Sequence, residues 1–266
     1  MKTLIYQVAV GRPSALYSHC IQSVKQYCDK HQIDHIVQTK PILRIKPDVF
    51  STNRSRESYE KHGGYLPIYE KENAFDYLDE YDQIAIIDAD IYIRDSAPNI
   101  FNDMDPHAAF GAVCEREMPI TPEYQKKIIG YSRMQYDVLH KNKKLNFKPN
   151  ELGYEFYNMG MIVINCSSFK PYLNGQTAKQ FIQRSEFKDF VDGKGAWKWS
   201  TDQTLLNYFL KKYNVSTHHF DWKWNGLFTA NTKIEQCHFV HFFLKDKLPN
   251  NGENVRQLMT LIGENW

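Results

Sequence analysis

Apolar residues in this chain fall into two patterns, short β-branched runs and longer segments with helical spacing. The short runs predict strands at residues 3–11, 33–38, 84–87, 107–114, 157–165, 215–220 and 236–243. Helical spacing and helix-start residues predict helices at residues 13–29, 66–81, 121–143, 178–184, 201–212 and 255–262. A strand, a helix and a strand follow one another within the first forty residues, as in parallel sheets. We therefore expect an α/β fold with a mixed, mostly parallel sheet flanked by helices.

The remaining segments carry little regular pattern. Residues 40–64 are rich in proline, serine and charged residues and predict an irregular loop. Internal repeats, low-complexity tracts and convincing linkers are not visible in the sequence. A chain of 266 residues can bury one large core. We expect a single domain over residues 1–266.

Composition narrows the class of protein. Lys and Arg together number 33 and Asp and Glu number 31, so the balance does not favour a nucleic-acid partner. An apolar run long enough to span a membrane is lacking, and the N-terminus has no signal-peptide pattern. The five cysteines are scattered and include no Cys-X-X-Cys pair, which favours small buried residues in a reducing compartment. We expect a cytoplasmic protein.

Two aspartates, Asp88 and Asp90, follow the apolar run at residues 84–87. Carboxylates are rarely buried without a partner, because removing an unpaired charge from water is very costly. Side chains at positions i and i+2 of a strand point to the same face, so both carboxylates can reach one cation. A strand that ends in solvated acids is the alternative. The apolar residues 91–93 after the triplet favour a shared site.

This Asp-X-Asp triplet, after a buried strand in the first half of a strand–helix–strand chain, resembles the GT-A-fold glycosyltransferases. The resemblance implies a Rossmann-like sheet, with a nucleotide-binding half at about 1–115 and an acceptor-binding half at about 116–266. It also implies a bound Mn²⁺ or Mg²⁺, a UDP- or GDP-sugar donor and a carbohydrate acceptor. A hard cation with oxygen ligands would neutralise the departing nucleoside diphosphate.

Two later segments look like glycosyltransferase family 8 in particular. Residues 156–165 are similar to the family's Phe-Asn-X-Gly-apolar-Asn strand, which implies that Asn158 and Gly160 line the donor sugar. Residues 201–207 are similar to its Asp-Gln-X-X-Leu-Asn helix start. This implies that Asp202 contacts the transferred sugar and Gln203 lies near its anomeric carbon. From the residues alone, the first segment is a core strand and the second a capped helix.

The segment at residues 241–249 resembles the family's His-aromatic-X-Gly-X-X-Lys-Pro motif. The resemblance implies that His241 completes a metal site with the two aspartates, and that Lys247 contacts the donor diphosphate. Asp88 would bind the metal, the ribose of the donor, or both. Leu244 stands where the family has glycine, so the register stays open and His238 is the competing metal ligand.

Four more residues are assigned to the donor. Lys71 precedes Asp88 at about the distance of a donor-contacting Arg in the family, although lysine lacks the bidentate fork. Gly11 and Arg12 follow the first predicted strand, where open α/β sheets bind nucleotides. Ala89 lies within the triplet itself.

Family 8 resemblance implies that the anomeric configuration of the sugar is retained. An inverting enzyme is the alternative and needs a carboxylate base, for which Asp202, Glu115 and Glu117 are candidates. A nucleotidyltransferase or a non-catalytic sugar-binding protein is a further alternative. A phosphatase-like haloacid dehalogenase is disfavoured, because its aspartate pair normally ends the first strand.

Tryptophans occur in two Trp-Lys-Trp segments. If these segments are extended, alternation places both rings of a pair on one face, where they can stack on an acceptor sugar. Burial in the core is the other interpretation. The candidate acceptor residues are Trp197, Trp199, Trp222 and Trp224.

Overall fold

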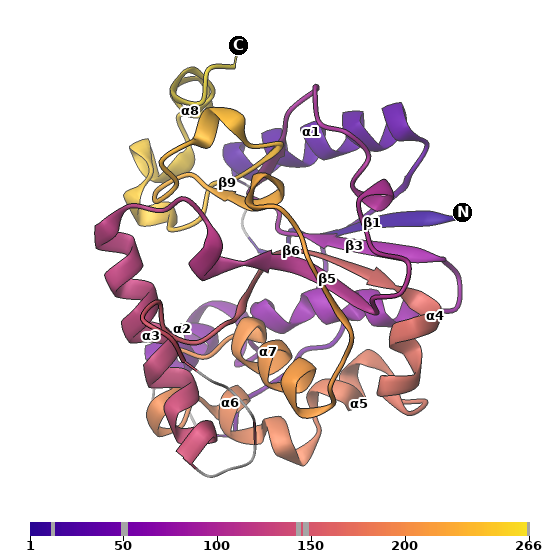
Figure 1. Cartoon of the computed structure of the whole chain (residues 1–266), viewed down its shortest axis with the longest axis vertical. Helices are drawn as coiled ribbons and strands as arrows, with labels where there is room; N and C mark the ends of the chain where they lie inside the picture. Colours follow the sequence, from indigo (N-terminus) through magenta and orange to yellow (C-terminus); the bar gives the residue numbers. More distant parts are fainter. Residues whose placement is uncertain (12–13, 49–52, 142–144, 146–148, 265–266) are drawn as a thin grey trace.

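A central six-stranded sheet organises the molecule, a computed structural model that describes residues 1–11, 14–48, 53–141, 145 and 149–264 (Figure 1). The strand order is β2-β1-β3-β6-β5-β7, and only β6 runs against its neighbours. The strands are β1 (Thr3–Val8), β2 (Asp34–Gln38), β3 (Gln83–Ile87), β5 (Phe110–Cys114), β6 (Tyr157–Asn165) and β7 (Thr217–His219). Every residue of β3, β5 and β6 is buried, as expected for central strands with both faces covered.

Helices cover both faces of this sheet. Figure 1 shows α1 on one side and α5, α6 and α7 on the other. The α-helices are α1 (Ala15–His31), α2 (Asn53–His62), α3 (Pro122–Lys141), α4 (Cys166–Phe169), α5 (Ala178–Ile182), α6 (Lys188–Asp192), α7 (Asp202–Lys212) and α8 (Val255–Leu261). The predicted α/β fold with a mostly parallel sheet flanked by helices is confirmed.

A second, smaller sheet lies beside the first and has the order β4-β9-β8. Its strands are β4 (Ile91–Ile93), β8 (Gly226–Leu227) and β9 (Phe239–His241). In the antiparallel pair of β4 and β9, Ile91 stands opposite His241. Side chains of α1, β9 and α8 form a separate apolar cluster around this sheet, which includes Leu16, Val240 and Leu258. The sequence pattern did not separate this sheet from the main one.

The secondary structure predicted for two segments was wrong. The expected loop at residues 40–64 contains α2, whose serines and charges hid its pattern, although Glu57 and Lys61 pair one turn apart at 2.7 Å. The expected helix at 66–81 is a 3₁₀ helix, η1 (Pro67–Tyr77). All its residues from Tyr69 to Phe75 are buried, so it presents no single apolar face.

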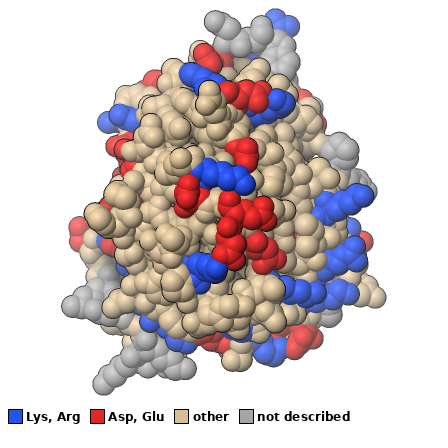
Figure 2. All heavy atoms as spheres, turned by 90° about the vertical axis from the view of Figure 1, so that its right-hand side faces the viewer, with Lys and Arg blue, Asp and Glu red and all other residues tan. Residues whose placement is uncertain are grey.

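The charge pattern of the surface is mixed. Figure 2 shows acidic and basic side chains close together over the middle of one face, with further basic side chains along one margin. Among the described residues, no helix is both long enough and apolar enough to cross a membrane. All five cysteines are buried and free.

Candidate active site

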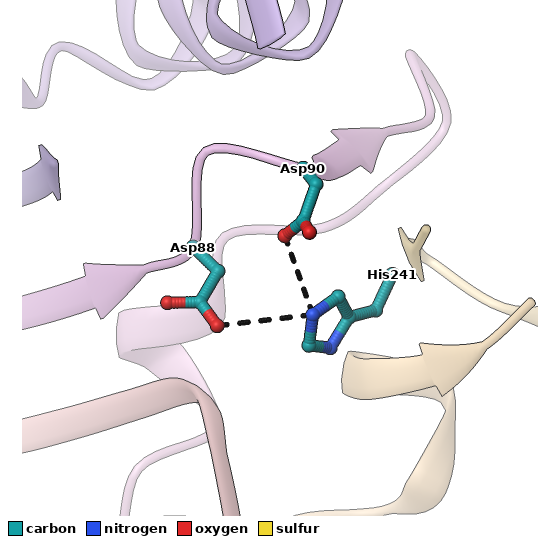
Figure 3. Close-up of side chains that lie close together, drawn as sticks. All are labelled: Asp88, Asp90 and His241. Atoms are coloured by element: carbon teal, nitrogen blue, oxygen red, sulfur yellow. Dashed lines mark ion pairs between the residues drawn. The ribbon is translucent and has the colours of Figure 1, made fainter. Parts of the chain in front are cut away.

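Three candidate metal ligands meet where the two sheets join (Figure 3). Asp88 follows β3, Asp90 precedes β4, and His241 ends β9. The Nε2 atom of His241 lies 3.3 Å from Asp90 Oδ1 and 3.7 Å from Asp88 Oδ2. One ligand atom from each residue lies within 4.8 Å of the other two. Two carboxylates and an imidazole suit a divalent cation such as Mn²⁺.

Backbone hydrogen bonds fix the two aspartates. The N–H of Asp88 donates to the Gly160 carbonyl at 2.8 Å, which ties the end of β3 to β6. The N–H of Phe242 donates to the Asp90 carbonyl at 2.9 Å, which ties the triplet to the end of β9. The main sheet therefore places Asp88, and the small sheet places Asp90 beside His241.

His238, the competing histidine, lies outside this cluster. Its ring packs against the Trp224 ring at 4.9 Å, and burial lowers the pKa of its imidazole. The structure also shows the backbone conformation at Leu244, where the family motif has glycine. Leu244 has φ 57° and ψ 64°, the left-handed conformation that glycine adopts most easily. The backbone at this position is one that glycine favours, and a leucine occupies it.

Gly160 gives His241 room to approach. A Cβ atom at Gly160 would lie 2.3 Å from His241 Cε1 and 2.6 Å from His241 Nδ1, far inside normal contact distance. The resemblance implied that Gly160 lines the donor sugar. In the structure, its absent side chain makes space for a candidate metal ligand.

Lys71 joins two of the predicted site residues. Its buried ammonium lies 2.8 Å from Asp88 Oδ1 and 2.8 Å from Asp202 Oδ2, and it donates to the Met159 carbonyl at 2.9 Å. Burial alone would lower the pKa of Lys71, but Asp202 and Asp88 raise it. Two carboxylates and one carbonyl oxygen thus surround the ammonium. The predicted contact with a donor phosphate would require Lys71 to give up one of these contacts.

The buried carboxylate of Glu115 is the centre of a second polar cluster. It accepts hydrogen bonds from Tyr124 Oη at 2.8 Å, Asn158 Nδ2 at 3.1 Å and Gln203 Nε2 at 3.4 Å. Burial raises the pKa of Glu115, and these three hydrogen bonds oppose that rise. Glu115 therefore holds Asn158 and Gln203 in place. Glu117, by contrast, is exposed and lies 3.9 Å from His219 Nδ1.

The predicted sugar-binding residues lie on two elements: Asp202 and Gln203 at the start of α7, and Asn158 in β6. Asp202 is the first residue of α7, and Thr201 caps the helix by accepting from the Gln203 N–H at 3.2 Å. Asp202 is only 2% exposed, whereas Gln203 is partly exposed. The Asn158 amide bonds to Glu115 and accepts from the Gly160 N–H at 2.9 Å. Of these side chains, Gln203 is the one that the structure leaves accessible.

The tryptophans are not on extended segments, so the geometric reason for pairing their rings was wrong. Trp197 ends the 3₁₀ helix η6 (Gly195–Trp197), and Trp199 follows in a turn with 49% exposure. Trp222 and Trp224 belong to the 3₁₀ helix η7 (Trp222–Asn225). Trp224 is buried and donates to Asp103 Oδ2 at 2.7 Å, while Trp222 is partly exposed.

The remaining predicted donor residues differ in exposure and backbone conformation. Lys247 is exposed at the end of the 3₁₀ helix η9 (Lys245–Lys247). Gly11 follows β1 with φ 126°, a conformation that favours glycine, and Ala89 is buried. Arg12 lies outside the described residues.

Sequence reasoning missed four residues of this site. Asn225 bonds to His241, Tyr124 bonds to Glu115, and Glu72 is buried directly after Lys71. Burial together with the charges of Asp90 and Asp88 raises the pKa of the fourth residue, Tyr17, which lies on α1. None belongs to a motif that we identified, although Asn225 directly follows the second Trp-Lys-Trp segment.

Comparisons with known proteins support the same class of fold. The family model described as Glycosyl transferase family 8 matches residues 3–247. No curated protein matches the chain. An active-site mutant of LgtC is 15% identical, with a TM-score of 0.55, over 98% of this chain and 95% of that one. A glycosyltransferase involved in glycosylation of the PBCV-1 major capsid is 10% identical, with a TM-score of 0.54, over 97% and 100% of the chains.

A third similar structure is the galactosyltransferase LgtC in complex with donor and acceptor sugar analogs. It is 16% identical, with a TM-score of 0.52, over 98% of this chain and 95% of that one. These likenesses confirm the predicted GT-A fold.

Replacing Gly160 by Ala should displace His241 and weaken Mn²⁺ binding by about ten- to a hundredfold, the usual effect of disturbing the support of a ligand. Isothermal titration with Mn²⁺ would measure the change. Gly130→Ala is the matched control, because no atom lies within 4 Å of a Cβ built at this helical glycine. That variant should keep its Mn²⁺ affinity and gain up to about 1 kcal/mol in stability. Equal Mn²⁺ affinities for both variants and the unmodified protein would contradict the packing argument.

Proposed function

This chain belongs to glycosyl transferase family 8, and we propose that it is a metal-dependent, retaining enzyme that transfers a hexose-type sugar from a nucleotide-diphosphate donor to a carbohydrate acceptor. Family membership and fold make it a glycosyltransferase. The observation that carries the finer proposal is the meeting of Asp88, Asp90 and His241 at the carboxyl end of β3. Open α/β sheets bind their ligands at this end.

The residues present fit a divalent cation. Lys71 engages Asp88 Oδ1, which leaves Asp88 Oδ2 facing His241 Nε2 and the Asp90 carboxylate. These three side chains would hold Mn²⁺ or Mg²⁺. When bound, the cation would neutralise the charge that develops on the departing diphosphate.

Residues outside the metal cluster would bind the nucleotide part of the donor. Gly11, Arg12 and Ala89 would contact the nucleotide, a UDP or GDP group, and exposed Lys247 would reach the diphosphate. The solved complex of LgtC with donor and acceptor sugar analogs supports sugar partners. The metal ligands come from both the nucleotide-binding half (about 1–115) and the acceptor-binding half (about 116–266). Five buried, unpaired cysteines support a reducing, cytoplasmic location.

Two of the three candidate bases are engaged, which supports retention over inversion by Asp202 or Glu115. Asp202 is buried against Lys71, and Glu115 already accepts three hydrogen bonds. Glu117 is exposed beside His219 and is the base that an inverting mechanism would have to use. An inverting enzyme needs an available carboxylate base next to the acceptor hydroxyl. Partly exposed Gln203 instead offers an amide to support a positively charged sugar transition state.

An open cavity next to this site has the chemistry of an acceptor-sugar pocket. Its volume is about 340 Å³, and its lining includes Trp222, Glu117, His219 and Asp221. An aromatic ring with carboxylates and an imidazole around it can stack on a sugar and bind its hydroxyl groups. Trp222 and Asn225 stand at positions i and i+3 of η7, which eclipse in a 3₁₀ helix. One turn of η7 therefore connects the cavity lining to the residue that contacts His241.

Removing the metal should abolish transfer, and Mn²⁺ should restore it. A screen of UDP- and GDP-sugars for metal-dependent hydrolysis would identify the donor and provide the assay. His241→Ala should raise the Mn²⁺ concentration needed for half-maximal activity, because one ligand is lost, and should leave the protein folded.

His238→Ala is the matched control in this experiment. It should mainly lower thermal stability, because it removes the ring that packs on Trp224, and should leave the Mn²⁺ requirement unchanged. Full turnover in the presence of a chelator would reject the metal-dependent mechanism. A raised Mn²⁺ requirement in His238→Ala alone would reject the assignment of His241.

Trp222→Ala should raise the acceptor KM with a smaller effect on kcat, because a stacking surface for the bound sugar is lost. Trp224→Ala should instead destabilise the protein by about 3–5 kcal/mol, since a buried tryptophan is removed. Initial rates over a series of acceptor concentrations and urea unfolding curves would separate the two effects. An unchanged acceptor KM in Trp222→Ala would place the acceptor elsewhere.

Gln203→Ala should slow transfer roughly ten- to a thousandfold, the range for a lost orienting or charge-stabilising group. Proton NMR of the first-formed product should show the anomeric configuration of the donor sugar. In an inverting enzyme with Asp202 as base, the product would have the opposite configuration. Asp202→Asn would then lose nearly all transfer while still binding donor.

A further inference from the structure

A chain of buried amides connects the backbone of β6 to the imidazole of His241. The Gly160 N–H donates to Asn158 Oδ1 at 2.9 Å, and Asn225 Nδ2 donates to the same oxygen at 2.8 Å. Asn225 Oδ1 lies 3.0 Å from His241 Nδ1. The Asn158 amide group also donates to Glu115 Oε2 at 3.1 Å. Four residues and one backbone N–H thus form a continuous path.

The direction of every hydrogen bond in this path follows from its fixed ends. A backbone N–H can only donate, so the Asn158 atom that it faces must be the amide oxygen. Asn225 therefore turns its NH₂ group toward that oxygen and its own oxygen toward His241. At the other end, the Asn158 NH₂ group faces the Glu115 carboxylate, which is an acceptor. Both ends give the same orientation for the two amides.

This polarity fixes the tautomer of the imidazole. Because Asn225 Oδ1 can only accept, Nδ1 of His241 must carry the hydrogen. The neutral ring then has its lone pair on Nε2, the nitrogen that lies 3.3 Å from Asp90 Oδ1 and 3.7 Å from Asp88 Oδ2. A lone pair on Nε2 is what a metal ligand at this position requires.

Burial leaves these groups without replacement partners. Asn225 is 0% exposed, His241 is 5% exposed and Asn158 is 7% exposed, so solvent does not substitute for a lost amide. A buried polar group without a hydrogen-bond partner destabilises the protein. In the alternative tautomer, the lone pair of His241 Nδ1 would face the accepting oxygen of Asn225, and neither atom would have a donor. The amide chain therefore keeps a hydrogen on Nδ1 before any cation binds.

We propose that Asn225 is a positioning residue, which holds His241 with Nδ1 protonated and the Nε2 lone pair directed at the site of Asp88 and Asp90. The proposal rests on the proposed metal-dependent function only for its consequence, the binding of the cation. The tautomer itself is a property of the metal-free protein. Because Asn225 is fully buried, it would act through His241 and not by touching the sugar or the diphosphate.

Long-range proton–nitrogen NMR spectra of metal-free protein with labelled histidine would test the tautomer directly. At alkaline pH, where the imidazole is neutral, His241 should show a protonated Nδ1 and an unprotonated Nε2. Asn225→Leu, which lacks the accepting oxygen, should allow a substantial population with the hydrogen on Nε2. Asn225→Asp should keep the hydrogen on Nδ1, since a carboxylate also accepts.

Titration calorimetry with Mn²⁺ would measure the consequence. Asn225→Leu should bind Mn²⁺ about ten- to a hundredfold more weakly, the usual cost of losing a group that orients a metal-bound histidine. Asn225→Asp should bind Mn²⁺ more tightly than Asn225→Leu does. If no Mn²⁺ binds to the unmodified protein, the proposed function fails, while the NMR spectra still decide the role of Asn225.

Asn165→Leu is the matched control, because Asn165 is also a buried amide of β6, 7% exposed, and bonds to Gln83 and the Ala108 carbonyl away from the metal ligands. This variant should lose stability but keep both the His241 tautomer and the Mn²⁺ affinity. A hydrogen on Nε2 in the unmodified metal-free protein would overturn the proposal, even if Asn225→Leu does not fold. Unchanged spectra and Mn²⁺ affinity in a folded Asn225→Leu would also overturn it.

Discussion

The ammonium of Lys71 between Asp88 and Asp202 is the interaction on which the active site depends. Each of these carboxylates lies at the end of a different element, one after β3 and one at the start of α7. Without a shared cation, the two charges would repel each other in a largely buried space. Removing one partner of such a buried group typically costs about 3–5 kcal/mol, because an uncompensated charge is left behind. Lys71 therefore joins the predicted metal ligand to the predicted sugar-binding helix.

Around this centre, several buried side chains form hydrogen bonds with one another rather than with solvent. Glu115 collects three donors, and the Asn158 amide connects it to Asn225 and His241. Fully bonded networks of this kind are rigid, because each member would lose a hydrogen bond if it moved. Rigid placement is useful in transfer chemistry, where electrostatic groups act best when they are already oriented before the reaction. The same bonding limits the ligands that Asn158 and Glu115 can contact directly.

The site also depends on the small sheet, whose strands have only two or three residues each. Such short strands have little stability of their own and are held by packing against α1 and α8. Their pairing brings His241 next to the aspartate triplet and places Asn225 just before β8. A chain segment far from Asp88 in sequence thereby completes the site. Mutations that loosen this apolar cluster would therefore act on the metal ligands through the backbone.

Local pattern determined much of the protein. The apolar run of β3 located the aspartate pair at a strand end, and helical spacing located α1, α3 and α7. The expected strand geometry of the pair was wrong, because β3 ends at Ile87 and Asp90 lies in the turn that leads to β4. Local pattern failed in two segments: the polar sequence of α2 hid a helix, and η1, buried over most of its length, is a 3₁₀ helix where an α-helix was predicted. The proximity of His241 rather than His238 to the two aspartates, the ion pairs of Lys71 and the hydrogen bond between Asn225 and His241 are visible only in the tertiary structure. Each depends on which distant atoms meet at hydrogen-bonding distance, and the pairing of β4, β9 and β8 sets those distances.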